Sequence, residues 1–212
     1  MRNDLTIIYY TNNREDPDYE FKVRNHLVET AKGLPIISVS HKPIELGKNI
    51  CVGEVGSSDW NIAKQIYIGC ERAKTKYVAM AEADCVYPPT GYFDFVPPSD
   101  ETAYRFDNIW ILFPGSGAYR HKEYSLCGMI SNRELLMRRI ESRFKRKPRF
   151  RVAGGKKDIF YKRAGWVPFT GPIAIINMKT GGSMRKFSGT DEKSHSLPYW
   201  GKTSHLEKEF RL

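Results

Sequence analysis

Residues 77–89 read Tyr-Val-Ala-Met-Ala-Glu-Ala-Asp-Cys-Val-Tyr-Pro-Pro, an apolar run that ends in two acids and then two prolines. The run is too short for a helix and the prolines end it, which together predict a buried β-strand. Side chains two residues apart on a strand point to the same side, so Glu82 and Asp84 are expected to converge on one hard cation. Carboxylates, waters and substrate phosphate oxygens are the usual ligands of Mg²⁺ bound to a diphosphate. For an isolated Glu-x-Asp, a solvated corner between strand and loop is the alternative interpretation.

The segments before this strand predict an α/β domain. Apolar runs predict strands at 5–10, 36–39 and 49–53, and apolar spacing with capping residues predicts helices from about 17 to 32 and from 59 to 74. Strands that alternate with helices are typical of a mainly parallel sheet, in which ligands bind at the carboxyl ends of the strands.

The pattern changes after Pro97-Pro98. Two apolar runs, 102–106 and 109–113, predict a hairpin through Asp107-Asn108, and further strands are expected at 124–130 and 173–176. Ser131, with Glu134 three residues later, predicts a capping box that opens a basic helix over 133–147. The residues from 177 onward are rich in turn formers and predict a flexible flap that orders over a bound substrate.

Composition limits the class of protein. A chain of 212 residues is long enough to form one domain with a substantial core. The four cysteines are widely spaced and form no CxxC pair, so the sequence predicts reduced, mostly buried thiols, and neither a disulfide framework nor a zinc site. No apolar stretch approaches the length of a membrane span or a signal peptide, which predicts a cytoplasmic protein.

Positive charge is concentrated in residues 131–163. This segment holds thirteen Lys or Arg against three acids, which equals the whole formal charge of +10. A solvated face is the ordinary interpretation of such a run. Aromatic residues are interleaved with it, and cations combined with stacking rings also suit nucleic-acid phosphates and an extruded base.

Several motifs together resemble one family, the small family-2-like glycosyltransferases of phages and environmental bacteria, which have the Rossmann-like GT-A fold. The resemblance covers nearly the whole chain and is most specific over 49–89. The matching segments are Tyr-Thr-Asn at 10–12, Ser-His-Lys-Pro-Ile-x-x-Gly-Lys-Asn-Ile-Cys-Val-Gly at 40–53, Asn-Ile-Ala-Lys-Gln-Ile at 61–66, Glu-x-Asp-Cys-Val-Tyr-Pro-Pro at 82–89 and Pro-Tyr-Trp-Gly-Lys at 198–202.

The resemblance implies a single domain over 1–212, with a nucleotide-sugar half at 1–100, an acceptor half at 101–176 and a C-terminal flap at 177–212. It also implies a metal-dependent hexosyl- or pentosyltransferase that uses Mn²⁺ or Mg²⁺ and a UDP-sugar. The donor-binding residues would be Tyr10, Thr11, Asn12, Lys64, Gln65, Glu82, Ala83 and Asp84.

This chain departs from the family at two positions. The first acid of the acidic motif is Glu82 where relatives usually have Asp. Relatives also often carry His where this chain has Asn177-Met178-Lys179, so His195, with His205 as an alternative, is the candidate third metal ligand.

Catalysis in such an enzyme stabilises a diphosphate leaving group with cations. Lys179 or Arg185, with Lys202 as an alternative, is the expected organic cation. Asp158, with Glu123 as an alternative, is the expected general base if the reaction inverts the sugar.

The acceptor is expected to be duplex DNA that carries a hydroxymethylated base. The residues expected to bind it are Arg138, Arg143, Lys145, Arg146, Lys147, Arg149, Lys156, Lys157 and Trp166. Two alternatives stay open. One is transfer to a lipopolysaccharide, capsule or protein glycan; the other is a non-catalytic nucleic-acid-binding module on a degenerate transferase fold.

Overall fold

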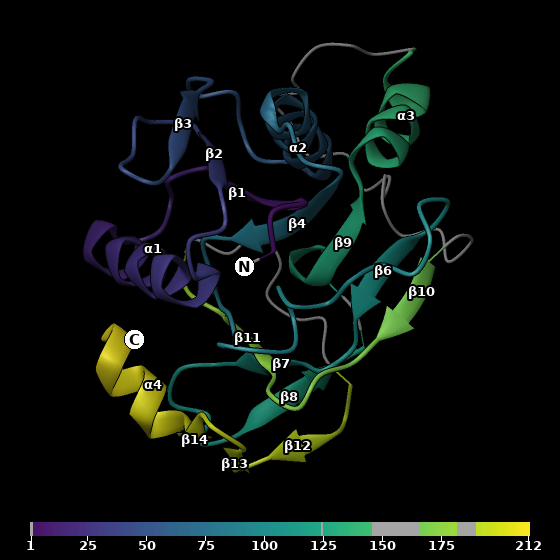
Figure 1. Cartoon of the computed structure of the whole chain (residues 1–212). Coiled ribbons are helices and arrows are strands. Elements are labelled where there is room, and N and C mark those ends of the chain that lie inside the picture. The colour runs from purple at the N-terminus through teal and green to yellow at the C-terminus, as the bar shows by residue number, and fades with distance from the viewer. Residues whose placement is uncertain (1, 124, 146–165, 182–189) are drawn as a thin grey trace.

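A computed structural model describes residues 2–123, 125–145, 166–181 and 190–212. Its central sheet has seven strands in the order β10-β6-β9-β4-β1-β2-β3, and β9 runs antiparallel to both of its neighbours while the other pairs are parallel (Figure 1). The strands are β1 (Leu5–Thr11), β2 (Ile36–Ser40), β3 (Lys48–Cys51), β4 (Tyr77–Glu82), β6 (Ala103–Phe106), β9 (Met129–Asn132) and β10 (Trp166–Phe169).

Three helices flank this sheet: α1 (Pro17–Ala31), α2 (Asp59–Arg72) and α3 (Arg133–Phe144). Successive side chains of β1 point to opposite faces of the sheet, so this strand contacts helices on both faces. Tyr9 belongs to the same core cluster as Leu27 of α1, whereas Ile8 belongs to the cluster that contains Ile66 of α2 and Leu136 of α3. These observations confirm the predicted α/β class, with a mainly parallel central sheet flanked by helices.

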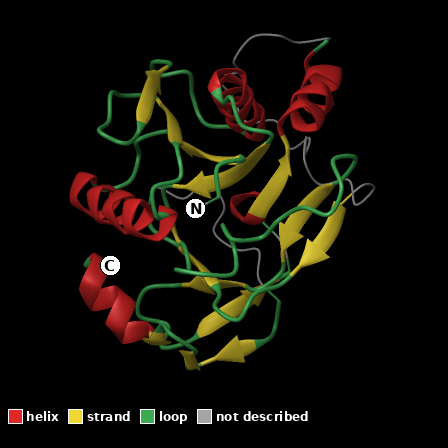
Figure 2. Cartoon of the chain, viewed as in Figure 1, coloured by secondary structure: helices red, strands yellow, loops and turns green. Residues whose placement is uncertain are grey.

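A second sheet lies beside the first (Figure 2). The order of its strands is β12-β8-β7-β11-β5. Its strands are β5 (Cys85–Val86), β7 (Ile109–Leu112), β8 (Tyr119–Lys122), β11 (Ile175–Met178) and β12 (Lys193–Ser194). A small ribbon of β13 (Ser196–Leu197) and β14 (Gly201–Lys202) leads into α4 (Thr203–Phe210). Because β5 follows β4 after only two residues, the chain passes from one sheet to the other at Ala83 and Asp84.

The predicted hairpin between 102–106 and 109–113 is wrong. Both segments are strands, but β6 pairs with β9 and β10 in the first sheet, whereas β7 pairs with β8 and β11 in the second. The turn at Asp107-Asn108 therefore carries the chain between two sheets. Local turn chemistry could not reveal this, because the pairing depends on partners far along the chain.

Two features near α3 also differ from the prediction. Instead of a strand over 124–130, a short 3₁₀ helix, η1 (Leu126–Gly128), precedes β9. Helix α3 begins with Asn132, whose side chain accepts a hydrogen bond from the Leu135 amide, and not with a Ser131 capping box. Ser131 is a fully buried strand residue that pairs with Val78 of β4, so it is not available as a cap.

The C-terminal segment contains a helix that the sequence analysis missed. Trp200, Leu206 and Phe210 are buried, and the Trp200 indole donates a hydrogen bond to the Ala174 carbonyl at 2.8 Å. Residues 203–210 therefore dock onto the second sheet and α1 and are not a loop. None of the helices in the described part of the chain is both long and apolar enough to cross a membrane.

Candidate functional site

The two acids of the Glu-x-Asp motif lie at the junction between the sheets. Glu82 is the last residue of β4, and Asp84 follows in the turn that leads to β5. The turn is held from the second sheet, because the Met178 amide donates to the Asp84 carbonyl at 2.7 Å. Ala83, between them, is buried. Backbone contacts therefore fix the motif from β1, which pairs with β4 as far as Glu82, and from β11, which contacts Asp84.

Glu82 is tied to the neighbouring strand by Tyr10. The two residues are register partners in the parallel pair of β1 and β4, so their side chains lie on the same face. The Tyr10 hydroxyl donates to Glu82 Oε1 at 2.5 Å. Burial raises the pKa of the Glu82 carboxyl, and the charge of Asp84 raises it further, while the Tyr10 hydrogen bond lowers it. The two carboxylates are thus close enough to repel each other.

Asp84 is paired with a lysine. Lys179 Nζ lies 3.5 Å from Asp84 Oδ2, and the two side chains are only 10% and 14% exposed. Burial is the largest single influence on the pKa of Lys179 and lowers it, but Asp84, Cys85, Glu82 and Cys127 together raise it by more, so the net pKa is raised. The ammonium therefore keeps its charge in a largely buried place. The sequence analysis proposed Lys179 as a cation in the site, and the structure brings it beside Asp84.

Two further charged residues, Lys122 and Glu15, lie at the site, although no sequence motif identified them as site residues. Lys122, on β8, is only 8% exposed, and its charge counteracts the rise in the pKa of Glu82. Glu15 accepts a hydrogen bond from the Thr180 hydroxyl. Burial raises the pKa of Glu15, and the charge of Asp84 also raises it. Both residues come from segments far from the motif, so only the tertiary fold identifies them.

A cavity of about 560 Å³ adjoins this cluster between the start of α1, the segment after β11 and the chain's C-terminus. This volume is within the usual range for small-molecule sites. Its charged lining includes Arg14, Glu15, Lys22, Lys179 and Arg211. Because Lys179 lines the cavity and also pairs with Asp84, the cavity and the carboxylates belong to one region.

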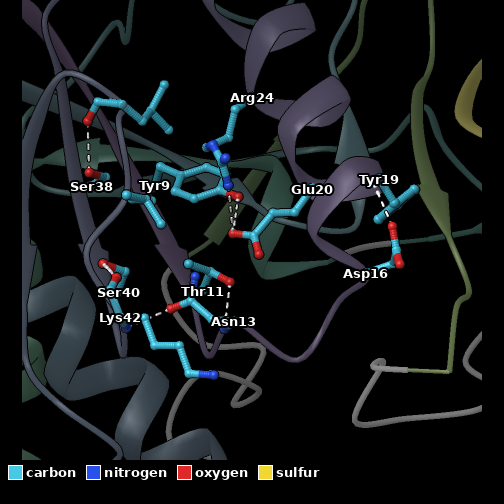
Figure 3. Close-up of polar contacts among 12 residues, drawn as sticks. Tyr9, Thr11, Asn13, Asp16, Tyr19, Glu20, Arg24, Ser38, Ser40 and Lys42 are labelled. Carbon is cyan, nitrogen blue, oxygen red and sulfur yellow. Dashed lines mark hydrogen bonds and ion pairs between the residues drawn. The ribbon is translucent and has the colours of Figure 1, made fainter.

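The ends of β1 and β2 form a hydrogen-bonded rim, part of which Figure 3 shows. Asn13 joins the two ends, because its amide donates to Thr11 Oγ1 at 2.9 Å and its side chain accepts from the Lys42 amide at 2.8 Å. The Gln65 side chain donates to the Thr11 and Val39 carbonyls at 2.8 and 3.0 Å. Gln65 of α2 therefore links the ends of β1 and β2.

Asn12 connects this rim to helix α2. Its side-chain amide donates to Ser57 Oγ at 2.8 Å, just before the Ser58 cap of the helix. The amino end of α2 therefore lies beside the carboxyl end of β1. A helix amino end favours an anion, which is consistent with a phosphate-binding role.

The structure shows contacts of Lys64 and His195 with residues outside the acidic motif. Lys64 Nζ is 4.9 Å from the centre of the Phe144 ring on α3. His195 is exposed between β12 and β13, and its Nδ1 lies 3.0 Å from the Gly117 carbonyl oxygen. Asp158 and Arg185 lie outside the described residues. The roles of these residues remain predictions.

The predicted nucleic-acid-binding residues are only partly described. Arg138, Arg143 and Lys145 are exposed on or just after α3. The Trp166 ring lies 3.9 Å from Arg105 Cζ, so one of its faces already carries a cation. Outside the described residues lie Arg146, Lys147, Arg149, Lys156 and Lys157.

The donor set around Asp84 fits a hard divalent cation. The charges of Glu82 and Glu15 are each coupled to that of Asp84, and oxygen ligands are those that Mg²⁺ and Mn²⁺ prefer. A cation here would relieve the repulsion that raises the pKa of Glu82. Asp84 and Glu82 remain the predicted ligands of such a cation.

Comparisons with known proteins found similarities of backbone only. No protein-family model matches the chain, and no curated protein matches its sequence. Among solved structures, a glycosyltransferase involved in glycosylation of the major capsid of PBCV-1 is 12% identical, with a TM-score of 0.48, over 78% of this chain and 81% of that one.

Two others have the same TM-score of 0.48. The glycosyltransferase GlyE of Streptococcus pneumoniae TIGR4 is 10% identical over 79% of this chain and 45% of its own. The bifunctional IspDF of Campylobacter jejuni is 11% identical over 80% of this chain and 50% of its own. This chain therefore spans half or less of both proteins.

Proposed function

We propose that the protein transfers a sugar from a nucleotide-sugar donor, a UDP-sugar, to a hydroxyl acceptor. The observation that carries the proposal is the half-buried pair Glu82 and Asp84 at the carboxyl end of a central parallel strand, with Lys179 against Asp84. Ligands of α/β sheets bind at this edge. The motif resemblance over residues 49–89 supports the same function.

Charge is the main demand of this reaction. The leaving diphosphate gains negative charge as the sugar–oxygen bond breaks, and fixed cations in a partly dry site stabilise that charge better than water does. A bound Mn²⁺ or Mg²⁺, held by Asp84 and Glu82, would supply part of that positive charge. Lys179 and Lys122 supply positive charge from the protein itself.

The remaining residues have proposed roles in donor binding and proton transfer. Thr11 and Asn12 form the rim that would face the nucleotide, and Gln65 fixes that rim. Asp158 remains our proposal for the general base, and Arg185 for a second cation on the diphosphate.

For the acceptor we propose duplex DNA with hydroxymethylated bases. Helices α2 and α3 are antiparallel neighbours: Trp60 at the start of α2 packs on Phe144 at the end of α3, with ring centres 4.6 Å apart, and Arg133 at the start of α3 donates to the Cys70 carbonyl. The exposed Arg143 and Lys145 therefore lie by the amino end of α2, on the same side as the donor rim. Cations at that place suit a phosphate backbone.

The test is a transfer assay with manganese, a panel of UDP- and GDP-sugars, and duplex DNA with plain or hydroxymethylated pyrimidines, read by nucleoside mass spectrometry. We expect a hexose or pentose mass on the modified base only. Asp84→Asn should abolish it, and the exposed Asp191→Asn should not. Failure of the wild type to bind any nucleotide-sugar would overturn the transferase and favour a non-catalytic nucleic-acid-binding module.

Two outcomes would separate the acceptor from the reaction. Donor hydrolysis with no mass on DNA would keep the transferase and move the acceptor to a lipopolysaccharide, capsule or protein glycan. DNA binding should also weaken steeply with salt, because each phosphate contact releases a counterion. Affinity that does not change between low and moderate salt would contradict a DNA acceptor.

A further inference from the structure

We infer that Glu82, Cys85 and Cys127 form a binding site for a thiophilic divalent cation of the Zn²⁺ class. The ligand atoms of these three residues all lie within 4.8 Å of one another. Cys85 and Cys127 are fully buried, and Glu82 is half-buried, so the carboxylate forms the accessible side of the cluster. Cys127 comes from η1, forty-two residues after Cys85, and the fold alone joins them.

The spacing suits a small tetrahedral ion. Zn²⁺ binds sulfur at about 2.3 Å and oxygen at about 2.0 Å, so tetrahedral ligands lie roughly 3.5–3.8 Å apart. Ligand atoms that start within 4.8 Å of one another therefore need to approach by about 1.3 Å at most. Rotation of thiol and carboxylate side chains covers such a distance without moving the backbone.

Asn177 provides an independent observation. It is 1% exposed, and its side-chain amide donates to Cys85 Sγ at 3.1 Å, as outer hydrogen-bond donors do to metal-bound thiolates. Its Oδ1 atom is buried and has no hydrogen-bond partner among the described residues. An unpaired buried acceptor is unfavourable. The atom of Asn177 that faces the cluster is its Nδ2 donor, so Asn177 would hold one thiolate ligand in place and a bound water would complete the fourth position.

The ligand chemistry separates this site from the hard-cation site proposed at Asp84. Mg²⁺ and Mn²⁺ prefer oxygen ligands, whereas two sulfur atoms and one carboxylate favour Zn²⁺, Co²⁺ or Cd²⁺. The sites share Glu82. If the proposed transfer reaction holds, Zn²⁺ at the thiols would draw Glu82 away from Tyr10 and inhibit transfer.

The test uses Co²⁺ as a spectroscopic probe on the reduced full-length protein under anaerobic conditions. Binding should produce sulfur-to-cobalt charge-transfer absorption with one ion per chain, and added Zn²⁺ should remove it. This signal reports the metal alone, so it stands or falls independently of any transferase activity.

Variants identify the ligands. Cys85→Ser and Cys127→Ser should each lower Co²⁺ affinity at least about tenfold. Cys51→Ser and Cys70→Ser, one exposed and one buried elsewhere, should leave it unchanged. Glu82→Gln keeps both thiols and should weaken binding without loss of the charge-transfer band. No band in the wild type, or the same affinity in the folded Cys85→Ser and Cys127→Ser proteins, would overturn the inference.

Discussion

The hydrogen bond from Tyr10 to Glu82 offers a sharp test of how the site is held. The bond is 2.5 Å long, and Tyr10 is 4% exposed. The acceptor is the Glu82 carboxylate, whose pKa is also raised by the charge of Asp84. Tyr10→Phe removes one oxygen and leaves the ring in place. The substitution therefore deletes the bond with almost no change of packing.

The size of the effect follows from the charge on the acceptor. A hydrogen bond to a charged group contributes about 1.5–3 kcal/mol, so the free energy of unfolding should fall by about 2 kcal/mol. For a chain of this length, 1 kcal/mol shifts the melting temperature by about 2–4 °C, which predicts a fall of about 4–8 °C. Glu82 would also lose the contact that orients it, so manganese-dependent nucleotide-sugar binding should weaken.

Tyr9→Phe is the matched control, and Figure 3 shows its surroundings. The Tyr9 hydroxyl donates to buried Glu20 at 3.0 Å, and Arg24 lies 3.4 Å from the same carboxylate oxygen. This variant also loses a hydrogen bond to a carboxylate, but on the face of β1 that packs on α1. Its stability should fall by a similar amount or slightly less, because Arg24 still pairs with Glu20.

The assay combines thermal unfolding of both variants with calorimetric titration of a UDP-sugar in the presence of Mn²⁺. We expect both proteins to lose stability and only Tyr10→Phe to lose donor affinity. Equal loss of affinity in both would show that affinity follows stability alone. Unchanged affinity in Tyr10→Phe would refute the proposed role of Glu82 in holding the metal.

Two further predictions concern pH and the C-terminal helix. Burial, reinforced by the charge of Arg14, lowers the pKa of His41, so the unfolded chain takes up a proton first as the pH falls below about 6.5. The neutral, buried His41 therefore contributes to the free energy of unfolding above that pH, and the contribution is lost as the pH falls below it. In urea unfolding, His41→Gln should make the free energy of unfolding fall less steeply between about pH 7 and pH 5 than it does in the wild type. An equally steep fall in the variant would contradict this role of His41. Phe210 is 2% exposed and packs on Tyr19 of α1, with ring centres 6.3 Å apart. Phe210→Ala should cost about 3–5 kcal/mol and expose the C-terminus to proteolysis, whereas Tyr199→Ala, at a side chain 60% exposed, should change stability by less than about 0.5 kcal/mol; equal protease resistance would count against the docked helix.

The first half of the chain could be predicted from the sequence because its signals are local. The strand at 5–10 extends by one residue to Thr11, and the strand at 36–39 by one residue to Ser40. Helix α1 begins at Pro17 after the Asp16 cap, as its residue types predict. The strands are specified by their apolar runs, and the helix by its apolar spacing together with its cap. No distant contact is therefore needed to predict these elements.

The second half could not be predicted in the same way because its strands are chosen by distant partners. The run at 109–113 is equally apolar on both faces, and its period therefore does not distinguish a hairpin from a strand buried between β8 and β11. The same holds for the site. Lys122 lies near Glu82 because the second sheet meets the first there, and Cys127 lies near it because η1 packs against β4; neither residue belongs to a local motif.

The position of Lys179 shows how this junction sets the chemistry. Strand β11 pairs with β5 on one side, where Asn177 faces Cys85, and with β7 on the other, where Met178 faces Leu112. Just beyond the strand, the Lys179 amide donates to the Leu112 carbonyl, and its ammonium reaches Asp84. A slip of one residue would turn alternate side chains to the opposite face, so Lys179 would leave Asp84 and Asn177 would leave Cys85. One strand register therefore fixes both the cation beside the acidic motif and the amide beside the thiols.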